Sequence, residues 1–397
     1  MAAVAIDYER IIPRRIAGMP PSGIRKFFDL LDGMTDVTAL TVGQPDFVTP
    51  WHIREAGIES LEKGKTYYTS NAGTMELRQE ICAYLARRFS LQYDPAHETV
   101  VTVGGSEAID IAMRALLEPG DEVIIPTPCF VCYAPIAELC GAVPVTVRTR
   151  SEDRFKLTPE LLESAITPRT KMLVLAYPNN PTGAIMDADD LERIAGILRE
   201  HQIIVLSDEI YAELTYGRRH VSIASLPGMR ERTVCCSSLS KTYSVTGWRL
   251  GYALAPQNIM DRIKQYHDFN TVGAPSPLME AAVVGLDMPM SYYEEFGAHY
   301  AHMKALFTGG MKELGIPFTD PQGTYFVLAD ISPFLKKGQS DVDFCVEMAQ
   351  KIGVGAVPGS SFFDEDVNHI IRLHFAKKDE TLNTALERLS HLKDLAR

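Results

Sequence analysis

The fold of this chain is decided by the stretch Ser238-Leu239-Ser240-Lys241-Thr242-Tyr243-Ser244-Val245-Thr246-Gly247-Trp248-Arg249-Leu250-Gly251-Tyr252. The hydroxyls of Ser238 and Ser240, together with the guanidinium of Arg249, can form an anion site for a phosphate. A lysine beside such a site, Lys241, can form a Schiff base once burial and neighbouring charge lower its pKa to roughly 7–8. A phosphate-bearing carbonyl beside a lysine is typical of pyridoxal 5′-phosphate (PLP). Taken alone, the same residues suit a serine-rich loop with an exposed lysine equally well.

The composition places the chain among globular proteins. It has 397 residues, of which 46% are hydrophobic and 23% charged, enough for two domains. The net charge of −12 argues against nucleic acid or an anionic membrane as the main partner. Apolar runs such as residues 172–176 are too short to span a bilayer, and residues 1–15 show no signal-peptide pattern. We therefore expect a cytoplasmic protein.

The cysteines do not indicate a metal centre. There are seven, an odd number that suits free thiols in a reducing compartment. Cys129 and Cys132 form a C-x-x-C pair without a second ligand pair, and the adjacent Cys235 and Cys236 lack metal-site spacing. We expect small buried residues and no metal.

Strands and helices alternate through the middle of the sequence. We expect strands at 99–103, 122–125, 143–147, 171–176, 203–207, 233–237 and 248–255, with helices at 107–117, 131–140 and 189–201. Such alternation predicts a mainly parallel sheet covered by helices on both faces. Ligand sites in these sheets lie beyond the carboxyl ends of the strands. Five polar or aromatic residues follow predicted strands there: Ser106, Phe130, Asn180, Asp208 and Lys241.

Further elements are predicted on both sides of this region, and those after residue 285 predict a second, smaller α+β unit. On the N-terminal side we expect helices at 23–33, 51–61 and 74–89 and a strand at 40–47; after residue 285 we expect helices at 290–314, 342–352 and 379–395 and strands at 323–328, 354–357 and 370–375. The predicted division is 1–48 (arm and part of the small domain), 49–285 (large domain) and 286–397 (small domain). Arg372 lies in mid-strand, where a buried charge needs a partner; an edge arginine facing water is the alternative.

Four motifs in this order resemble a known family. They are Asn180-Pro181-Thr182-Gly183, Ser207-Asp208-Glu209-Ile210-Tyr211, Ser238-x-Ser240-Lys241 and Gly247-Trp248-Arg249. The chain, from about Ile24 to its final helix, resembles the fold type I PLP-dependent aminotransferases of class I/II, in the subgroup of bacterial and archaeal aspartate, aromatic and N-acetyl-diaminopimelate enzymes. The resemblance implies a homodimer with shared active sites. It implies ping-pong transfer of an amino group from an L-amino acid to a 2-oxo acid, above all 2-oxoglutarate.

The resemblance also implies roles around the cofactor ring. Lys241 would form the Schiff base and then move a proton at the substrate as general base and acid. Asp208 would pair with the pyridinium nitrogen. Tyr211 and Asn180 would hydrogen-bond the ring's O3′, and Phe130 would stack on the ring.

The resemblance further implies a phosphate cup and a substrate clamp. The cup would comprise Gly105, the backbone N–H groups of Ser106 and Glu107 at a helix N-terminus, Ser238 and Arg249. Tyr68 would reach the neighbouring subunit's cofactor phosphate, with the adjacent Tyr67 as the alternative register. Arg372 would bind the substrate α-carboxylate, assisted by Gly43 and Asn180.

Rival functions remain at this stage. The same scaffold hosts PLP-dependent C–S lyases, because a fold does not determine its reaction. A PLP-sensing regulator would carry an N-terminal DNA-binding unit, which we do not expect here. Gly104-Gly105-Ser106 does not match the dinucleotide pattern G-x-G-x-x-G. No cation for a substrate side-chain carboxylate is evident, and Phe130 replaces the tryptophan common in aspartate enzymes, so we do not expect strict aspartate specificity.

Overall fold

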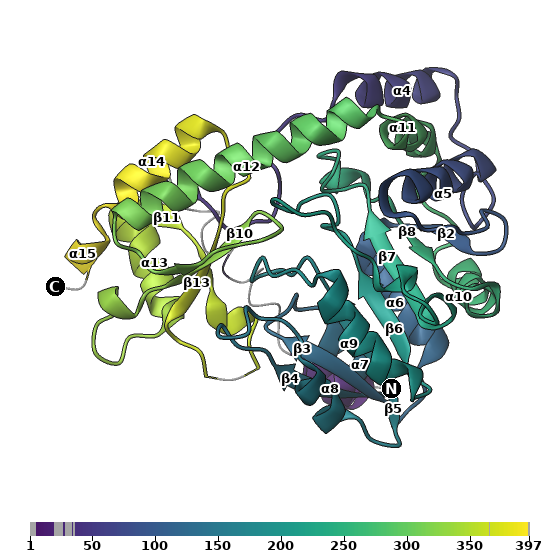
Figure 1. The fold of residues 1–397 in the computed structure, drawn as a ribbon, viewed down its shortest axis with the longest axis horizontal. Helices are drawn as coiled ribbons and strands as arrows, with labels where there is room; N and C mark the ends of the chain where they lie inside the picture. The colour runs from purple at the N-terminus through teal and green to yellow at the C-terminus, as the bar shows by residue number, and fades with distance from the viewer. Residues whose placement is uncertain (1–4, 20–26, 28–33, 35, 365, 396–397) are drawn as a thin grey trace.

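A seven-stranded sheet forms the centre of the larger part of the molecule (Figure 1). The computed structural model describes residues 5–19, 27, 34, 36–364 and 366–395. The strand order is β2-β8-β7-β6-β5-β3-β4, and all neighbours are parallel except β8, which is antiparallel to both β2 and β7. The strands are β2 (Thr99–Thr102), β3 (Glu122–Thr127), β4 (Val143–Arg148), β5 (Thr170–Ala176), β6 (Ile204–Asp208), β7 (Thr233–Ser238) and β8 (Gly251–Leu254). The predicted mainly parallel α/β fold is confirmed.

Helices cover both faces of this sheet. Successive strand residues point to opposite sides, so neighbouring residues of one strand pack against different helices. Leu206 packs with α6 (Gly104–Leu116), α7 (Tyr133–Leu139) and α10 (Gln257–Asn270) on one face. Val205 packs on the other face with α8 (Pro159–Ala165) and α9 (Ala188–Arg199). Near β8 this second face is covered by α4 (Trp51–Glu62), α5 (Met75–Phe89) and α11 (Ser276–Leu286). The central strands β3, β5 and β6, which are almost wholly buried, are rich in Val, Ile and Leu.

A second, four-stranded sheet lies in the C-terminal part. Its order is β12-β13-β10-β9, and every pairing is antiparallel. The strands are β9 (Phe318–Thr319), β10 (Phe326–Asp330), β12 (Val357–Pro358) and β13 (Ile370–His374), and the helices are α13 (Asp341–Ile352), α14 (Asp379–Leu389) and α15 (Leu392–Leu395). The long helix α12 (Met290–Glu313) bridges the two parts (Figure 1). Tyr293 lies in the core beneath α5 and α11, whereas Phe307 and Met311 lie in the C-terminal core.

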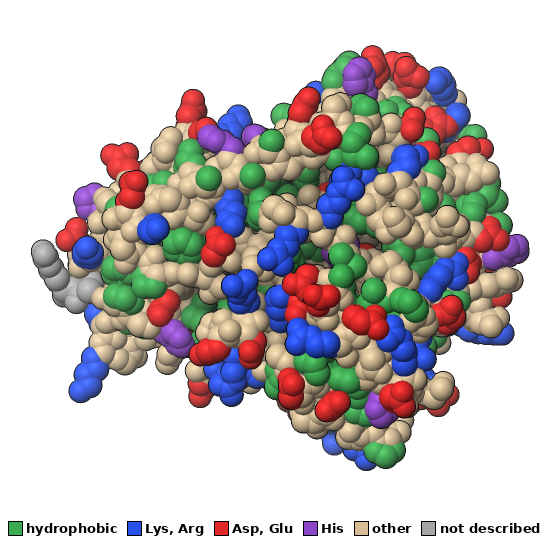
Figure 2. Space-filling view, in the orientation of Figure 1, with side chains coloured by type: hydrophobic (Ala, Val, Ile, Leu, Met, Phe, Trp, Pro, Cys, Tyr) green, Lys and Arg blue, Asp and Glu red, His purple; other side chains and the backbone are tan. Residues whose placement is uncertain are grey.

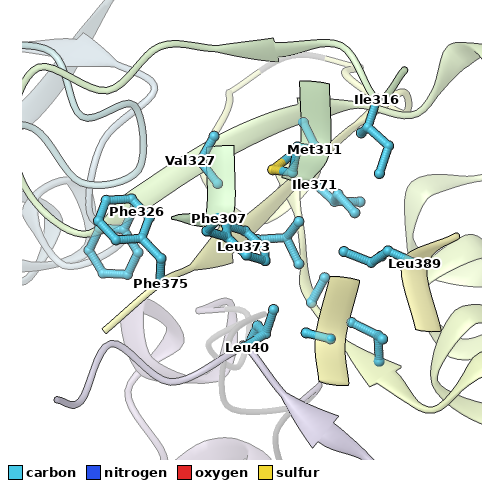
Figure 3. Close-up of a cluster of buried hydrophobic side chains, with 14 of the residues drawn as sticks. Leu40, Phe307, Met311, Ile316, Phe326, Val327, Ile371, Leu373, Phe375 and Leu389 are labelled. Atoms are coloured by element: carbon cyan, nitrogen blue, oxygen red, sulfur yellow. The ribbon is translucent and has the colours of Figure 1, made fainter. Parts of the chain in front are cut away.

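The N-terminal segment joins the C-terminal part. After the short helices α1 (Tyr8–Ile11) and α2 (Arg14–Ala17), strand β1 (Thr38–Ala39) pairs in parallel with β11 (Val354–Gly355). Leu40, fully buried, lies in the same apolar cluster as Phe307 and Leu373 (Figure 3). This attachment carries the segment that follows, Thr41 to Gly43, towards the space between the two sheets.

Several predicted boundaries are wrong for local reasons. Residues 40–47 are not a strand, since β1 ends at Ala39. The strand expected from residue 248 begins at Gly251, because a 3₁₀ turn (Thr246–Trp248) and the left-handed Arg249 (φ 54°) precede it. The strand expected from residue 323 begins at Phe326, after the left-handed Thr324 (φ 58°).

Other segments were split or not predicted. Residues 354–357 form two short strands, β11 and β12, in different sheets, and the final helix breaks between Leu389 and Leu392. Helices α8, α10 and α11 were not predicted. The helix expected at 23–33 lies, except for Phe27, outside the described residues.

The surface and the cysteines match the composition. Lys and Arg lie among Asp and Glu on the face in Figure 2 rather than in one basic patch. All seven cysteines are free thiols, five of them buried, with Cys132 and Cys140 half-buried. Within the part of the chain that the structure describes, no helix combines the length and the apolar character needed to cross a membrane.

Candidate active site

A cavity of about 270 Å³ opens where the carboxyl ends of the large sheet face the C-terminal part. Its lining contains residues that follow β3, β5, β6 and β7, together with residues from β10, β13 and the N-terminal segment. Eleven residues predicted for the site line it: Gly43, Gly105, Ser106, Phe130, Asn180, Asp208, Tyr211, Ser238, Lys241, Arg249 and Arg372. Strand order alone brings the large-sheet members together, because parallel strands end at one edge.

Lys241 presents its amine to this cavity. It follows β7, and its Nζ donates a hydrogen bond to the carbonyl oxygen of Gly43 at 2.6 Å. The Nζ also lies 5.9 Å from the centre of the Tyr211 ring. Burial, followed by the positive charges of Arg372 and Arg249, lowers the pKa of Lys241 to about 8. An amine with this pKa is partly unprotonated near neutral pH and can act as a nucleophile or base.

Asp208 is a buried carboxylate at the end of β6, between β5 and β7. The Tyr133 hydroxyl donates to its Oδ2 at 2.7 Å, and the Ile210 amide donates to its Oδ1 at 3.2 Å. Burial raises the pKa of Asp208 to about 6, against the effect of these two hydrogen bonds. No ion pair joins Asp208 to any of the described residues. The site therefore holds a carboxylate that a cationic ligand would stabilise.

Arg249 and the first turn of α6 form an anion cradle. Gly104, at φ 77°, has no room for a Cβ because the guanidinium of Arg249 lies against it. A Cβ on Gly251 would in turn clash with the backbone of Gly104. These two glycines let the guanidinium approach the helix N-terminus, where Gly105 and Ser106 line the cavity. Guanidinium, serine hydroxyls and helix amides together suit a phosphate.

Arg372 on β13 is buried, only 2% exposed, so the alternative of a water-facing edge arginine is wrong. Its Nη1 donates to Asn180 Oδ1 at 2.9 Å and its Nη2 to the Thr41 carbonyl at 2.6 Å. The guanidinium carbon lies 4.2 Å and 4.7 Å from the centres of the Phe326 and Phe362 rings. Burial lowers the pKa of Arg372 to about 10, so the side chain remains a cation at neutral pH. Its Nε is buried without a partner, which leaves binding capacity for an anion.

Comparison with known proteins identifies the family. The model of the "Aminotransferase class I and II" family matches residues 35–389. The chain belongs to the class I and II aminotransferases. It is 44% identical to the "Putative aminotransferase YugH" of Bacillus subtilis, over 93% of this chain and 95% of that one. It is 41% identical to the "Probable N-acetyl-LL-diaminopimelate aminotransferase" of the same organism, over 93% and 92%. The solved aromatic aminotransferase from Pyrococcus horikoshii superimposes with a TM-score of 0.86 at 36% identity, covering 94% and 98%.

Members of this family are PLP-dependent transferases, and this aminotransferase acts on amino acids and 2-oxo acids with PLP as cofactor. The residues present fit that group. The anion cradle at Arg249 suits its phosphate, the unpaired Asp208 suits its protonated ring nitrogen, and Lys241 suits its aldehyde. Bound PLP supplies an aldehyde that captures amines and a ring that accepts electrons from the substrate Cα.

Two residues that were predicted for the site, Glu107 and Tyr68, do not line the cavity. The side chain of Glu107 turns back to the Val103 amide, so only its backbone N–H belongs to the turn that borders the cavity. Tyr68 is 91% exposed and Tyr67 is 64% exposed. Both line a separate cleft with residues 271–274. The role assigned to Tyr68 needs a second chain and stays a prediction.

Sequence reasoning missed Tyr133 and Tyr325. Tyr133 lies three residues after Phe130, and this spacing could have indicated that both rings face the same site; their ring centres are 6.3 Å apart, edge to face. Tyr325 donates its hydroxyl to Gly43 O at 2.8 Å, the same carbonyl that Lys241 contacts. No sequence signal indicated this second contact, because it depends on how β10 meets the N-terminal segment.

Proposed function

We propose that Lys241 binds the cofactor and moves the proton at the substrate Cα, while Asp208 keeps the ring nitrogen protonated. The observation that carries this proposal is the low pKa of Lys241, whose buried amine shares one cavity with Asp208 and Arg372. Tyr211 and Asn180 hold the ring oxygen, and Phe130 covers the ring. Gly105, Ser106, Glu107, Ser238 and Arg249 hold the phosphate.

Arg372 is the proposed clamp for the substrate α-carboxylate. Its forked guanidinium can bind a carboxylate through two parallel hydrogen bonds, and Asn180 and the Phe326 ring fix its orientation. Gly43 borders the same space, since a Cβ there would lie 2.7 Å from Phe326 Cζ. The Gly43 carbonyl, which accepts from Lys241, is thus close to both the amine and the clamp.

The proposed donor is aspartate, an aromatic amino acid or a related L-amino acid, and the proposed acceptor is 2-oxoglutarate in a ping-pong cycle. Among the described residues lining the cavity, the cations are Lys241, Arg249 and Arg372. In this proposal Lys241 is the reacting amine, Arg249 binds the cofactor phosphate and Arg372 binds the substrate α-carboxylate, so each of the three cations already has a role. A substrate side chain would therefore meet no cation from these residues, which argues against strict aspartate specificity.

We propose a cytoplasmic homodimer with shared active sites. Exposed Val272 lines the cleft of Tyr67 and Tyr68, and Phe269, two residues before Thr271 in the sequence, is 90% exposed. Free thiols suit a reducing compartment.

The proposed domain division remains 1–48 with 286–397 as the small domain and 49–285 as the large one. The pairing of β1 with β11 and the separate sheets support it.

The test is a spectral titration of the purified protein. A yellow protein should lose its visible band when single donors are added: aspartate, phenylalanine, glutamate or N-acetyl-diaminopimelate. Addition of 2-oxoglutarate should restore the band, and the fastest donor names the substrate class. Release of pyruvate and ammonia from cystathionine, without an acceptor, would instead establish a lyase and overturn the proposal.

A further inference from the structure

A fully buried histidine lies beside the first turn of α6, outside the residues assigned above. His267 on α10 is 0% exposed. Its Nδ1 lies 3.2 Å from Glu107 Oε1, and its Nε2 lies 2.9 Å from the carbonyl oxygen of Asn71. Glu107 and Asn71 come from segments far from α10 in the sequence, so the imidazole joins three parts of the chain.

The contacts define the protonation state of this imidazole. A carbonyl oxygen only accepts hydrogen bonds, so Nε2 must donate to Asn71. The Glu107 carboxylate already accepts from the Val103 amide and the Thr271 hydroxyl, so Nδ1 must donate as well. His267 is therefore an imidazolium paired with a carboxylate. Burial is the largest single effect on each group and opposes its charge, but the mutual hydrogen bond and charge attraction, together with the hydrogen bonds to Asn71, Thr271 and Val103, outweigh it, so the pKa of His267 is raised and that of Glu107 is lowered.

This ion pair connects the phosphate cradle to the loop that carries the two exposed tyrosines. Glu107 holds the amide of Val103, the residue that immediately precedes the turn of Gly104 to Ser106. On the other side, α10 holds Asn71 twice, through His267 and through a 2.9 Å hydrogen bond from Asn71 Nδ2 to Asp268. Residues 66–69, just before Asn71, line a cleft of about 560 Å³ together with residues 271–274. The buried pair therefore holds two backbone segments: the residue just before the phosphate cradle, through Glu107, and Asn71 at the end of the loop, through His267.

We propose that the His267–Glu107 ion pair is a positioning device that fixes the α6 N-terminus, and the 66–71 loop beside it, for binding the cofactor phosphate. This inference rests on the proposed function, in which that turn holds the phosphate. The cofactor ring and aldehyde do not depend on the pair. Its loss should therefore weaken PLP and spare pyridoxal, which has the same ring and aldehyde without the phosphate.

The experiment compares the affinity of apoenzyme for PLP and for pyridoxal in wild type and in His267→Gln. A neutral glutamine removes the charge, and loss of a charge-assisted hydrogen bond predicts a PLP dissociation constant raised about tenfold. The constant for pyridoxal should stay within about twofold. Glu107→Gln should behave like His267→Gln. The control is His302→Gln, because His302 forms an exposed pair with Asp379 at 2.8 Å and should change neither constant.

The outcomes separate the two proposals. Equal losses for PLP and pyridoxal, or an unchanged PLP constant, would overturn the positioning role while wild type still binds PLP. If wild type itself binds no PLP, the proposed function fails. Should His267→Gln not fold, Thr271→Val removes only one donor to Glu107. A selective loss of PLP affinity, about threefold, is expected there, and its absence would count against the proposal.

Discussion

Replacing Asp208 by Asn should change how the stability of the apoenzyme depends on pH. Burial raises the pKa of Asp208 to about 6 from its ordinary value of 3.8. Between these two pH values the unfolded chain has released the proton and the folded chain still holds it, so this group makes stability fall as pH rises. The penalty is absent below the unfolded pKa and complete above the folded one. It amounts to about 3 kcal/mol, at about 1.36 kcal/mol for each pH unit between the two values.

The assay is urea denaturation of both apoproteins at equal protein concentration. Of the total, about 1.4 kcal/mol should accrue between roughly pH 5 and pH 8, so wild type should lose that much stability relative to Asp208→Asn over this range. Asn cannot ionise, but it remains able to accept the hydrogen bond from Tyr133 or Ile210. A difference between the two proteins that does not vary with pH would refute the buried, unpaired carboxylate. Activity should be largely lost in the variant.

Three further predictions concern the same cavity. Tyr133→Phe removes a donor to Asp208, so in the apoenzyme the pKa of Asp208 should rise by about 1 and the pH range over which this carboxylate lowers stability should move upward; an unmoved range would count against the contact. Arg372→Lys keeps the charge but loses the fork, so kcat/KM for amino acids should fall about a hundredfold, and wild-type kinetics would disprove the clamp. The rate at which PLP colours the apoenzyme should rise about fivefold from roughly pH 7 to 8 and less than twofold from 8 to 9, because Lys241 has a pKa of about 8. A tenfold increase at each step would indicate an ordinary lysine.

Much of the site could be predicted because strand ends determine it. Asp208 ends β6, and Asn180 and Lys241 follow β5 and β7. Strand–helix alternation predicts that all three lie at the carboxyl edge of one parallel sheet, and the observed strand order makes the three strands neighbours. The family motifs added roles that spacing alone could not provide. Those roles stay predictions until the variants are measured, whereas the family and the α/β fold are confirmed.

The remainder depends on contacts between distant segments. Arg249 has a left-handed backbone conformation, and its side chain packs closely against Gly104. No local sequence pattern predicts this conformation or this contact. Leu40 belongs to the apolar cluster of the C-terminal part, which also contains Leu373, although it does not lie in a strand. His267 looks like one polar residue on a helix until the fold places Glu107 and Asn71 on its two nitrogens.

The most direct test of the central claim is to identify the lysine that carries the cofactor. The PLP-loaded enzyme would be reduced with borohydride, digested and analysed by mass spectrometry. The account predicts a single phosphopyridoxyl label on the peptide containing Lys241, and no label in Lys241→Ala. A label on a different lysine, or none in the wild-type enzyme, would contradict it.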